Sequence, residues 1–498
     1  MNIGLQGGRI SFDESLFAGR GSMVAKREWD YIFNPQSVAI AGVSANQTTV
    51  PGAGQGFLEA VIDYGFKGKV YPLNPKGGAI KGLKMYANIK DVPESVDYVI
   101  SCVPASATPQ LIKDCAAKRV KAVHFFTSGF SETGTEEGKQ LEKEICSLAR
   151  QGGIRIIGPN CIGVYCPQGN LSFISNFPKR RGLVALICQS GGNTTYIIRE
   201  AGRRGVRFSK AVSYGNAADI NESDLLEYVA ADPDTGIILA YIEGVKDGQR
   251  FSRVLKETAK VKPVIVLKGG ISETGARAAA SHTGVLAGSE RVWDGLLRQA
   301  GAIRVYSLEE LIDMAVSFSY LPLPLGRRVG ILGIGGGATV LATDDCASAG
   351  LVVPRFPEEI HRRLSNLLGT EAGTILNNPV DLAAGAWDSG FYNTLNILAN
   401  YEGVDLSMVH FPLGLLVFPP TQHNVIWDLL VDDVVKGHRE LAKPVIVVIH
   451  IPTSGGDYEW MLETQRKFYK TGIPVYHSIG SAAKAIDRFL SYHEHKSA

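Results

Sequence analysis

The stretch LVALICQSGGNTTYIIREAG (183–202) shows the pattern that decides the fold of this chain. Its first residues form a short apolar run of the kind found in strands buried on both faces. A turn of small and polar residues, QSGG (189–192), follows and leads into a segment with helical spacing of apolar residues. A buried strand that passes through a glycine turn into a helix is the unit of a parallel α/β sheet, so we expect this stretch to be one of a series.

Apolar runs of the same kind recur along the chain and alternate with amphipathic, helix-like segments. This alternation predicts parallel sheets with right-handed crossovers. The runs are SVAIAGVS (37–44), KVYPLNP (69–75), VDYVISCVP (96–104), KAVHFFTSG (121–129), IRIIGPN (154–160), FSKAVSYG (208–215), GIILAYIEG (236–244), PVIVLKGG (263–270), VGILGIGGG (329–337), MVHFPL (408–413), KPVIVVIH (443–450) and IPVYHSI (473–479).

Two breaks divide the series. The segments FPKRRG (177–182) and PLPLGRR (322–328) combine proline, glycine and arginine, as linkers do. A chain of 498 residues also has room for about three domains. We therefore expect an N-terminal arm that packs on the body, followed by three tandem doubly wound α/β domains. The expected bounds are 1–34 for the arm and 35–178, 179–323 and 324–498 for the domains.

Composition excludes several classes of function. The net charge of +2 gives no electrostatic basis for binding nucleic acid or an anionic membrane. The N-terminus lacks the pattern of a secretory signal, and no apolar run has the length of a membrane span. The seven cysteines show neither paired nor metal-binding spacing, which favours free thiols in a reducing cytoplasm. We expect no metal site on this chain.

One histidine stands out by its surroundings. In VLKGGISETGARAAASHTGVLAGSE (266–290), His282 lies among glycine, serine, threonine and alanine. Such a loop can approach a bulky anion closely and can move, which suits a histidine that carries a group such as a phosphoryl. The alternative is a surface histidine without chemistry, and the segment alone does not choose between the two.

Two further turns in the same part of the chain carry polar groups. Gln189, Ser190, Gly191 and Gly192 form an anion cradle in outline, because a helix begins there. The turn lacks the glycine pattern of a serine nucleophile elbow. Glu243 ends an apolar strand, where it either orients a histidine or is a solvated turn carboxylate.

The first strand-to-helix turn, AGVSANQTTVPGAGQG (41–56), is glycine-spaced without a clean dinucleotide fingerprint. Where an NAD-binding domain places an acidic residue, this chain has Asn74-Pro75-Lys76. A cation there suits the extra phosphate of NADP or coenzyme A, although a solvated lysine in a tight turn is equally consistent. In the third domain, GIGGGAT (333–339) is a possible phosphate edge, and Asn378-Pro379 suits a structural turn. The chain contains neither a GxxxxGK[ST] phosphate loop nor a segment similar to an ATP-grasp domain.

Taken together, these stretches resemble the α subunit of the NDP-forming acyl-CoA synthetases, relatives of succinyl-CoA synthetase. The resemblance covers residues 31–490, and the SHTG block is its most specific part. It implies a Rossmann-like coenzyme A-binding domain followed by two flavodoxin-like ligase domains. The matching stretches are FNPQSVAIAGVS, GFKGKVYPLNPKGG, IGPNCIGV, ICQSGGN, VSYGNAADI, YIEGV, VLKGG with ARAAASHTGVLAGSE, NNPVDL and GIPVYHS.

The resemblance also implies roles for individual residues. His282 corresponds to a phosphohistidine and Glu243 to the glutamate that supports it. The remaining expected site residues bind either phosphate or coenzyme A. For phosphate they are Gln189, Ser190, Gly191, Gly192, Ser281, Thr283 and Gly284, and for coenzyme A they are Gly42, Ser44, Asn74, Lys76 and Pro104.

The implied reaction interconverts acyl-CoA, phosphate and ADP with a carboxylic acid, coenzyme A and ATP, through an acyl phosphate. ADP or ATP and Mg²⁺ are expected on a separate ATP-grasp β subunit, in an α2β2 or similar assembly in the cytoplasm. The chain departs from the family in its third domain, where Gly333 to Ala338 replace a Thr-Asn-x-Gly-Gly-Pro turn. Two alternatives stay open, a non-catalytic acyl-CoA sensor or scaffold and an NADP-dependent oxidoreductase.

Overall fold

The computed structural model describes residues 29–44, 52–272, 274–275, 289–334, 336–369, 375–382, 390–411, 420–451 and 455–497. The described residues form two compact units, each treated by itself below. One unit consists of residues 29–202 and 207–311 and contains a five-stranded sheet, a six-stranded sheet and a two-stranded hairpin. The other consists of Arg203–Val206 and residues 312–497 and contains one sheet.

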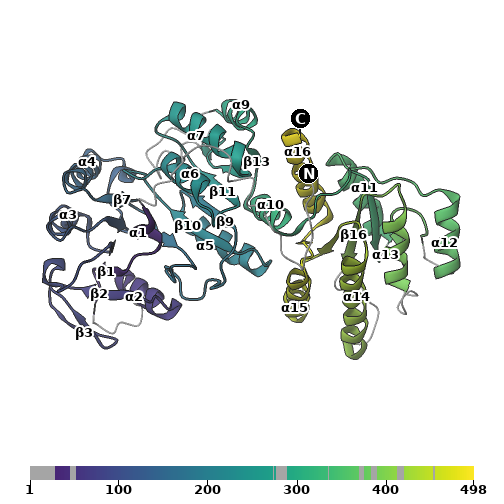
Figure 1. Cartoon of the computed structure of the whole chain (residues 1–498), viewed down its shortest axis with the longest axis horizontal. Coiled ribbons are helices and arrows are strands. Elements are labelled where there is room, and N and C mark those ends of the chain that lie inside the picture. Colours follow the sequence, from purple (N-terminus) through teal and green to yellow (C-terminus); the bar gives the residue numbers. More distant parts are fainter. Residues whose placement is uncertain are drawn as a thin grey trace. The chain divides into compact units, whose positions relative to one another are not determined.

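The first sheet has five parallel strands in the order β2-β1-β5-β6-β7, of which Figure 1 labels β1, β2 and β7. Helices α3 and α4 lie side by side, and α2 packs against β1. The strands are β1 (Ser37–Ala41), β2 (Lys69–Leu73), β5 (Tyr98–Ser101), β6 (Ala122–Phe125) and β7 (Arg155–Ile157). The helices are α1 (Asp30–Phe33), α2 (Ala53–Tyr64), α3 (Thr108–Ala117) and α4 (Glu136–Gln151), with short 3-10 turns at Ile89–Asp91, Ala105–Ala107 and Ser131–Thr133.

The second sheet has six strands in the order β13-β12-β11-β9-β10-β8, of which only the edge strand β8 runs antiparallel. Its strands are β8 (Gly163–Tyr165), β9 (Val184–Cys188), β10 (Phe208–Ser213), β11 (Ile237–Ile242), β12 (Val264–Lys268) and β13 (Ile303–Val305). Its helices are α5 (Gly191–Arg203), α6 (Glu222–Ala231), α7 (Gly248–Val261), α9 (Glu290–Ala300) and the start of α10 (Leu308–Tyr320).

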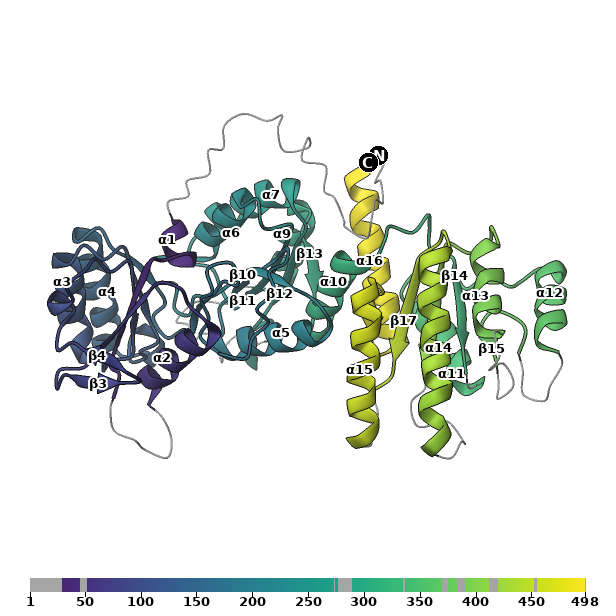
Figure 2. The same cartoon turned by 60° about the horizontal axis from the view of Figure 1, so that its bottom comes forward.

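The third sheet has five parallel strands in the order β15-β14-β16-β17-β18. Helix α11 packs against α16, while α12, α13, α14 and α15 follow one another as neighbours, as Figure 2 shows. The strands are β14 (Val329–Gly333), β15 (Val380–Asp381), β16 (Leu406–Phe411), β17 (Val445–Ile449) and β18 (Val475–Tyr476). The helices are α11 (Gly336–Ser348), α12 (Glu358–Leu368), α13 (Gly390–Asn400), α14 (Pro420–Glu440), α15 (Gly455–Thr471) and α16 (Ile479–Ser497).

The expected fold class is confirmed, and every strand predicted from an apolar run is present. The sequence did not indicate five short strands, namely β8, β13, β15 and the hairpin of β3 (Gly78–Ile80) and β4 (Leu83–Met85). Each has two or three residues, so it carries little periodic pattern of its own. Strands β7 and β18 are equally short, but the apolar runs 154–160 and 473–479 indicated them. Strand β15 includes part of the NNPVDL stretch. The Asn378 amide bonds the backbone of Ile331 and Val329 at 2.9 Å each, so this stretch has the structural use expected of it.

The three larger sheets share one winding. In each, the first parallel strand lies between the second and the third, which is the flavodoxin-like order 2-1-3-4-5. The winding direction therefore reverses beside the first strand, which is β1, β9 or β14. Ligands of such sheets bind at the carboxyl ends of the strands that flank this reversal. Gly42, the Gln189 turn and Glu243 follow strands at these ends.

The carboxyl edges of the first two sheets adjoin each other. The segment after β10 bonds the segment after β7 along the backbone: Asn216 N donates to Pro159 O at 3.0 Å and Ala218 N to Gly158 O at 3.0 Å. The Asn216 amide nitrogen also donates to the carboxylates of Glu132 at 2.6 Å and Glu142 at 3.0 Å. Two stretches that carried the family resemblance, IGPN and GNAADI, therefore join the two sheets.

The arm and the domain bounds are only partly addressed by the structure. Within the described part of the arm, Phe33 is fully buried and its ring stacks on Tyr228 of α6 at 4.9 Å. Strand β8 lies inside the predicted first domain but pairs with β10 of the second sheet. The bounds at 178 and 323 stay predictions.

All seven cysteines are free thiols, as expected, and five of them are buried. Burial raises the pKa of the Cys188 and Cys346 thiols to about 12, which leaves them unreactive near neutral pH. Among the residues described here, no helix is both long and apolar enough to cross a membrane.

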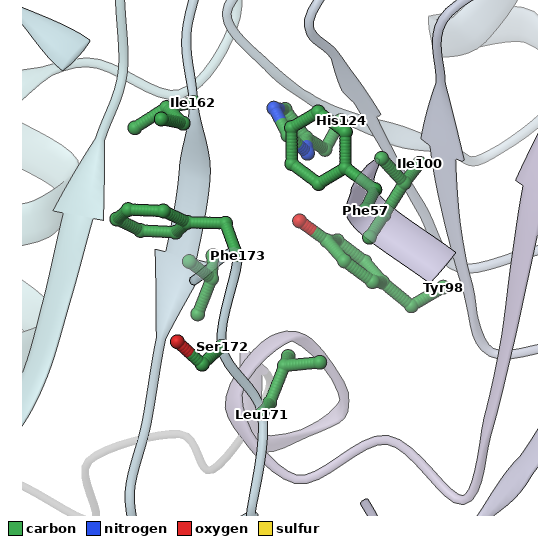
Figure 3. Close-up of a pocket in the computed structure, with 9 residues that line it drawn as sticks. Phe57, Tyr98, Ile100, His124, Ile162, Leu171, Ser172 and Phe173 are labelled. Atoms are coloured by element: carbon green, nitrogen blue, oxygen red, sulfur yellow. The ribbon is translucent and has the colours of Figure 1, made fainter. Parts of the chain in front are cut away.

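A small cavity of about 10 Å³ lies between the first sheet and the segment that contains β8 (Figure 3). Its walls are mostly apolar, and its buried polar groups are the Tyr98 hydroxyl, the His124 ring and the Ser172 hydroxyl. His124 Nε2 donates to the Cys161 carbonyl at 3.0 Å, which fixes the tautomer of the neutral ring. Burial lowers the pKa of His124 to about 4. This histidine is a structural residue that holds the segment after β7 against β6.

We expect His124→Gln to reduce the acid sensitivity of the first sheet. The pKa of His124 is lower in the folded protein than in the unfolded chain, so protons favour unfolding. The stabilisation is complete above about pH 6.5 and falls by about 3 kcal/mol as the pH drops towards 4. Hydrogen exchange of the β6 amides at pH 7.5 and pH 5 measures this loss, with exposed His495→Gln as the control. An equal loss in wild type and His124→Gln would contradict the assignment.

Candidate active site

The turn between β9 and α5 contains only Gln189 and Ser190. Ser190 caps the helix: its Oγ accepts from Asn193 N at 3.3 Å, and its carbonyl accepts from Thr194 Oγ1 at 2.7 Å. The Ser190 side chain is therefore used in holding the first turn, which argues against a nucleophilic serine. The first amides of a helix have no partner within it, so the Gly191 and Gly192 end of α5 offers donors and a positive dipole to an anion.

Gln189 connects the carboxyl ends of two neighbouring strands. Its backbone N–H donates to the Tyr241 carbonyl at 3.0 Å, and its side chain is 1% exposed. The side-chain oxygen accepts from the backbone N–H of Glu243 at 2.7 Å and of Gly244 at 3.2 Å. Because β9 and β11 flank the reversal of the second sheet, these bonds place Glu243 at its switch point.

Glu243 is buried, with 6% of its surface exposed, so the interpretation as a solvated turn carboxylate is wrong. A second strand holds it from the other side. Lys268, the last residue of β12, donates from Nζ to the Glu243 carbonyl at 2.7 Å. Desolvation lowers the pKa of Lys268 to about 8, against the opposing effect of the Glu243 charge. The backbone of Glu243 is thus fixed by Gln189 of the β9 turn and Lys268 of β12.

The histidine loop begins where these groups meet. His282, Ser281, Thr283 and Gly284 lie outside the described residues, and their roles stay predictions. The loop leaves the sheet after Lys268, beside the Glu243 backbone. After the loop, helix α9 begins at Glu290, and Ser289 caps it by accepting from Val292 N at 3.4 Å. The structure therefore brings the base of the predicted phosphohistidine loop to Glu243 and the Gln189 turn.

The predicted coenzyme A residues lie at the carboxyl edge of the first sheet. Gly42, Asn74 and Pro104 follow β1, β2 and β5, which are neighbours in the sheet. Gly42 has a φ of +90°, and a Cβ there would lie 2.7 Å from the Cys102 carbonyl, so no larger residue fits. Glycine at this position lets the turn after β1 pack directly against the backbone that follows β5.

The predicted coenzyme A residues of that edge are either bonded within a turn or accessible to solvent. The Asn74 amide nitrogen donates to the Val43 carbonyl at 2.5 Å, and its oxygen accepts from Lys76 N at 2.8 Å, so this side chain closes the turn. Lys76 and Pro104 are exposed, and Ser44 is half-buried. The structure therefore assembles the edge, whereas contacts of these residues with coenzyme A stay predictions.

Comparisons with known proteins bear on this arrangement. Residues 36–167 match the family model described as "CoA binding domain", and residues 181–318 match "Succinyl-CoA ligase like flavodoxin domain". The chain is 36% identical over 468 residues to the acetate–CoA ligase [ADP-forming] II subunit alpha of Pyrococcus furiosus, a match that covers 92% of this chain and 97% of that relative. The chain belongs to the α subunits of the ADP-forming acyl-CoA synthetases.

Two further relatives agree with this family assignment. The acetate–CoA ligase [ADP-forming] of Methanocaldococcus jannaschii is 41% identical over 361 residues, which is 72% of this α subunit and 50% of that protein. A solved structure of the dinucleotide-forming acetyl-coenzyme A synthetase 1 of Ca. Korarchaeum cryptofilum, in complex with phosphate and ADP, has a TM-score of 0.78 and 32% identity. It covers 94% of this chain and 97% of its own. This α subunit is part of an acid–thiol ligase, and the oxidoreductase alternative is wrong.

The sequence patterns assigned no role to two residues that hold the turns of Gln189 and Glu243. They are Lys268, which bonds the Glu243 carbonyl, and Tyr241, whose carbonyl accepts from Gln189 N. The available signal was a lysine at the end of the apolar run VIVLK, because a buried cation needs acceptors to offset its desolvation. The pairing of Lys268 with the Glu243 carbonyl depends on strand adjacency, which the sequence does not give.

We expect Gln189→Met to release the Glu243 backbone. Methionine has similar size but cannot accept the two hydrogen bonds, which leaves two buried N–H groups unsatisfied at about 1–3 kcal/mol each. Hydrogen exchange of the Glu243 and Gly244 amides should therefore accelerate by at least about 10-fold. Gln151→Met, on the exposed end of α4, is the matched control. Unchanged protection of both amides would show that the Gln189 bridge does not hold this turn.

Proposed function

We propose that this α subunit forms acyl-CoA from a small carboxylic acid through a phosphohistidine at His282. The observation that carries the proposal is the meeting of Glu243, the Gln189–Ser190 turn and the base of the His282 loop at one switch point. An imidazole beside a buried carboxylate and a helix N-terminus suits the temporary storage of a phosphoryl group.

The proposed chemistry has two steps on this chain. A carboxylate oxygen of the acid attacks the phosphorus of phospho-His282, the P–N bond breaks, and an acyl phosphate and a neutral imidazole result. The thiolate of coenzyme A then attacks the acyl carbonyl carbon and releases inorganic phosphate. Glu243 orients the imidazole and stabilises its positive charge while the phosphoryl group is attached. The N-terminus of α5 stabilises the phosphate charge in both steps.

We place coenzyme A in the first domain. The turns after β1, β2 and β5, with Gly42, Ser44, Asn74, Lys76 and Pro104, would receive it, and the exposed Lys76 ammonium suits its nucleotide phosphate. The adjoining carboxyl edges at β7 and β10 support this placement, because the thiol must reach the acyl phosphate near the second sheet. The family model that matches residues 36–167 bears the same description.

We also propose that the nucleotide and Mg²⁺ bind on a separate ATP-grasp β subunit. The Pyrococcus furiosus relatives that the chain covers to 97% and 98% are named as α subunits. In the Methanocaldococcus jannaschii relative the match covers only 50% of the protein, which leaves room for a fused module. We take the compartment to be the cytoplasm, where ADP and coenzyme A are available.

Labelling with [³²P]phosphate and acetyl-CoA tests the histidine. Acetate is the first choice of acyl group because the relatives covered end to end are acetate–CoA ligases. The wild-type chain should gain acid-labile phosphate, His282→Ala should gain none, and Glu243→Gln should lose its label at least about 10-fold faster because the imidazole lacks its counter-charge. His361→Ala, on α12, is the control.

Label retained in His282→Ala would overturn the proposed role of that residue. Absence of label from the wild-type chain, across a panel of acyl-CoAs of increasing size, would instead favour a non-catalytic acyl-CoA sensor. Equal label stability in wild type and Glu243→Gln would refute the supporting role of Glu243.

We further expect the purified chain to form no acyl-CoA from ATP, Mg²⁺, acetate and coenzyme A. Addition of the cognate ATP-grasp subunit should start turnover, because the nucleotide site then becomes available. A coupled assay of ADP release measures this. Robust turnover by the chain alone would refute the proposed division of the enzyme.

A further inference from the structure

The Asn216 side chain bridges the two carboxyl edges where they adjoin. It lies in the turn after β10 of the second sheet and is 1% exposed. Its amide nitrogen donates to the carboxylate of Glu132 at 2.6 Å and to that of Glu142 at 3.0 Å. Glu132 lies in the 3-10 turn after β6 of the first sheet, and Glu142 lies in α4. An amide NH₂ has two N–H groups, so each carboxylate receives one of them.

The two carboxylates decide which residue type suits position 216. An ionised carboxylate only accepts hydrogen bonds, so the nitrogen of the Asn216 amide faces both glutamates. This orientation leaves its Oδ1 buried and without a partner among the described residues, which is unfavourable. An aspartate would add a third negative charge at the same point, and an apolar side chain would supply no donor. Position 216 is therefore suited to donating to both glutamates.

The Glu132 side of the bridge is fixed to the predicted coenzyme A edge. The Glu132 carboxylate accepts from the backbone N–H of Gly129 at 2.6 Å, which closes the turn after β6. At the start of the same turn, Thr127 donates from Oγ1 to the Val103 carbonyl at 2.8 Å. Val103 directly precedes Pro104, one of the expected coenzyme A residues. The turn that carries Glu132 is thus bonded to the turn that carries Pro104.

The Asn216 side of the bridge is fixed to the proposed phosphate site. Tyr214 N donates to the carbonyl of Cys188, the last residue of β9, at 3.0 Å. Lys246, in the turn after β11, donates from Nζ to the Ala217 carbonyl at 3.0 Å. The Asn216 turn is therefore held by the same two strand ends that are followed by the Gln189 turn and by Glu243.

We propose that Asn216 is a positioning residue, whose amide holds the coenzyme A edge at the distance from the phosphate site that thioester chemistry needs. The inference rests on the proposed function, because only the coenzyme A step there uses groups from both edges. Its thiolate has to approach the acyl carbonyl carbon to about 3–3.5 Å, and a small displacement of one edge slows such a step strongly. Transfer between the acyl phosphate and His282 takes place at the second sheet and does not need the bridge.

Two phosphoryl donors separate these steps on the purified chain. Acetyl phosphate labelled with ³²P passes its phosphoryl group directly to the His282 imidazole and releases acetate. Acetyl-CoA with labelled inorganic phosphate first has to form acetyl phosphate, as a phosphate oxygen attacks the thioester carbonyl and the coenzyme A thiolate leaves. The first donor therefore requires only the edge of the second sheet, whereas the second donor requires both edges.

Asn216→Leu removes both donors and nearly keeps the size of the side chain. The labelling rate with acetyl-CoA and phosphate should fall at least about 10-fold, because the edges lose their fixed spacing. The rate with acetyl phosphate should stay within about twofold. Asn88→Leu is the matched control, since the Asn88 amide also donates to a carboxylate, that of Asp114 at 2.6 Å, but within the first domain alone. Both rates should stay at the wild-type level in this control.

A swapped pair tests the bridge independently of Asn216→Leu. Asn216→Asp brings three carboxylates together and should slow only the acetyl-CoA route. Adding Glu132→Gln supplies an amide whose oxygen can still accept from Gly129 N while its nitrogen donates to the carboxylate at position 216. The double variant should recover at least about threefold of the lost acetyl-CoA rate, since a hydrogen bond to a charged group is restored.

Three outcomes would overturn the inference and leave the proposed function intact. They are a wild-type rate of Asn216→Leu with acetyl-CoA, an equal loss with both donors, and no recovery when Glu132→Gln is added to Asn216→Asp. Failure of the proposed function shows differently: acetyl phosphate does not label the wild-type chain, or label is retained in His282→Ala.

Discussion

The amide oxygen of Gln189 is the acceptor on which the arrangement of the site depends. It bonds the backbone N–H groups of Glu243 and Gly244, where β11 has already left the sheet and the ladder no longer supplies partners. The Gln189 side chain thus continues the hydrogen bonding between β9 and β11 for two residues beyond the end of β11. Because the residue is almost fully buried, no water competes for these bonds. The carboxylate to which we assign the support of His282 is therefore attached to a rigid part of the backbone.

A buried cation completes the same constraint from β12. The Lys268 ammonium is desolvated and bonds the Glu243 carbonyl, and the Trp293 ring lies 5.2 Å from it. Such a cation is costly to bury unless its donors are matched, and here backbone carbonyls match them. The loop that carries His282 starts one residue later. Strand β12, which precedes the loop of the proposed carrier histidine, is thus hydrogen-bonded to Glu243, the residue that would support that histidine.

Flavodoxin-like winding explains why these groups converge. In an order 2-1-3-4-5, the turns after the first and third strands emerge on either side of the reversal, and neither is covered by the other's helix. The Gln189 turn and Glu243 occupy these two positions in the second sheet. The equivalent position in the first sheet holds Gly42, whose lack of a side chain lets the turn lie against the Cys102 carbonyl. The backbone bonds between the segments after β7 and β10 then bring the two carboxyl edges together.

The sequence by itself determined the fold class, the strands that lie within its apolar runs, and the positions of Gly42, Gln189 and Glu243 at strand ends. The local sequence pattern suffices for these features, because a buried strand and the glycine turn that follows it consist of consecutive residues. The short strands β8, β13 and β15 form only because a neighbouring strand supplies their partners. Tertiary structure alone decided that Glu243 is buried, that Ser190 is a helix cap and that Lys268 bonds the Glu243 carbonyl. Each of these depends on which strands are adjacent, and strand order is set by the packing of the whole sheet rather than by any local stretch.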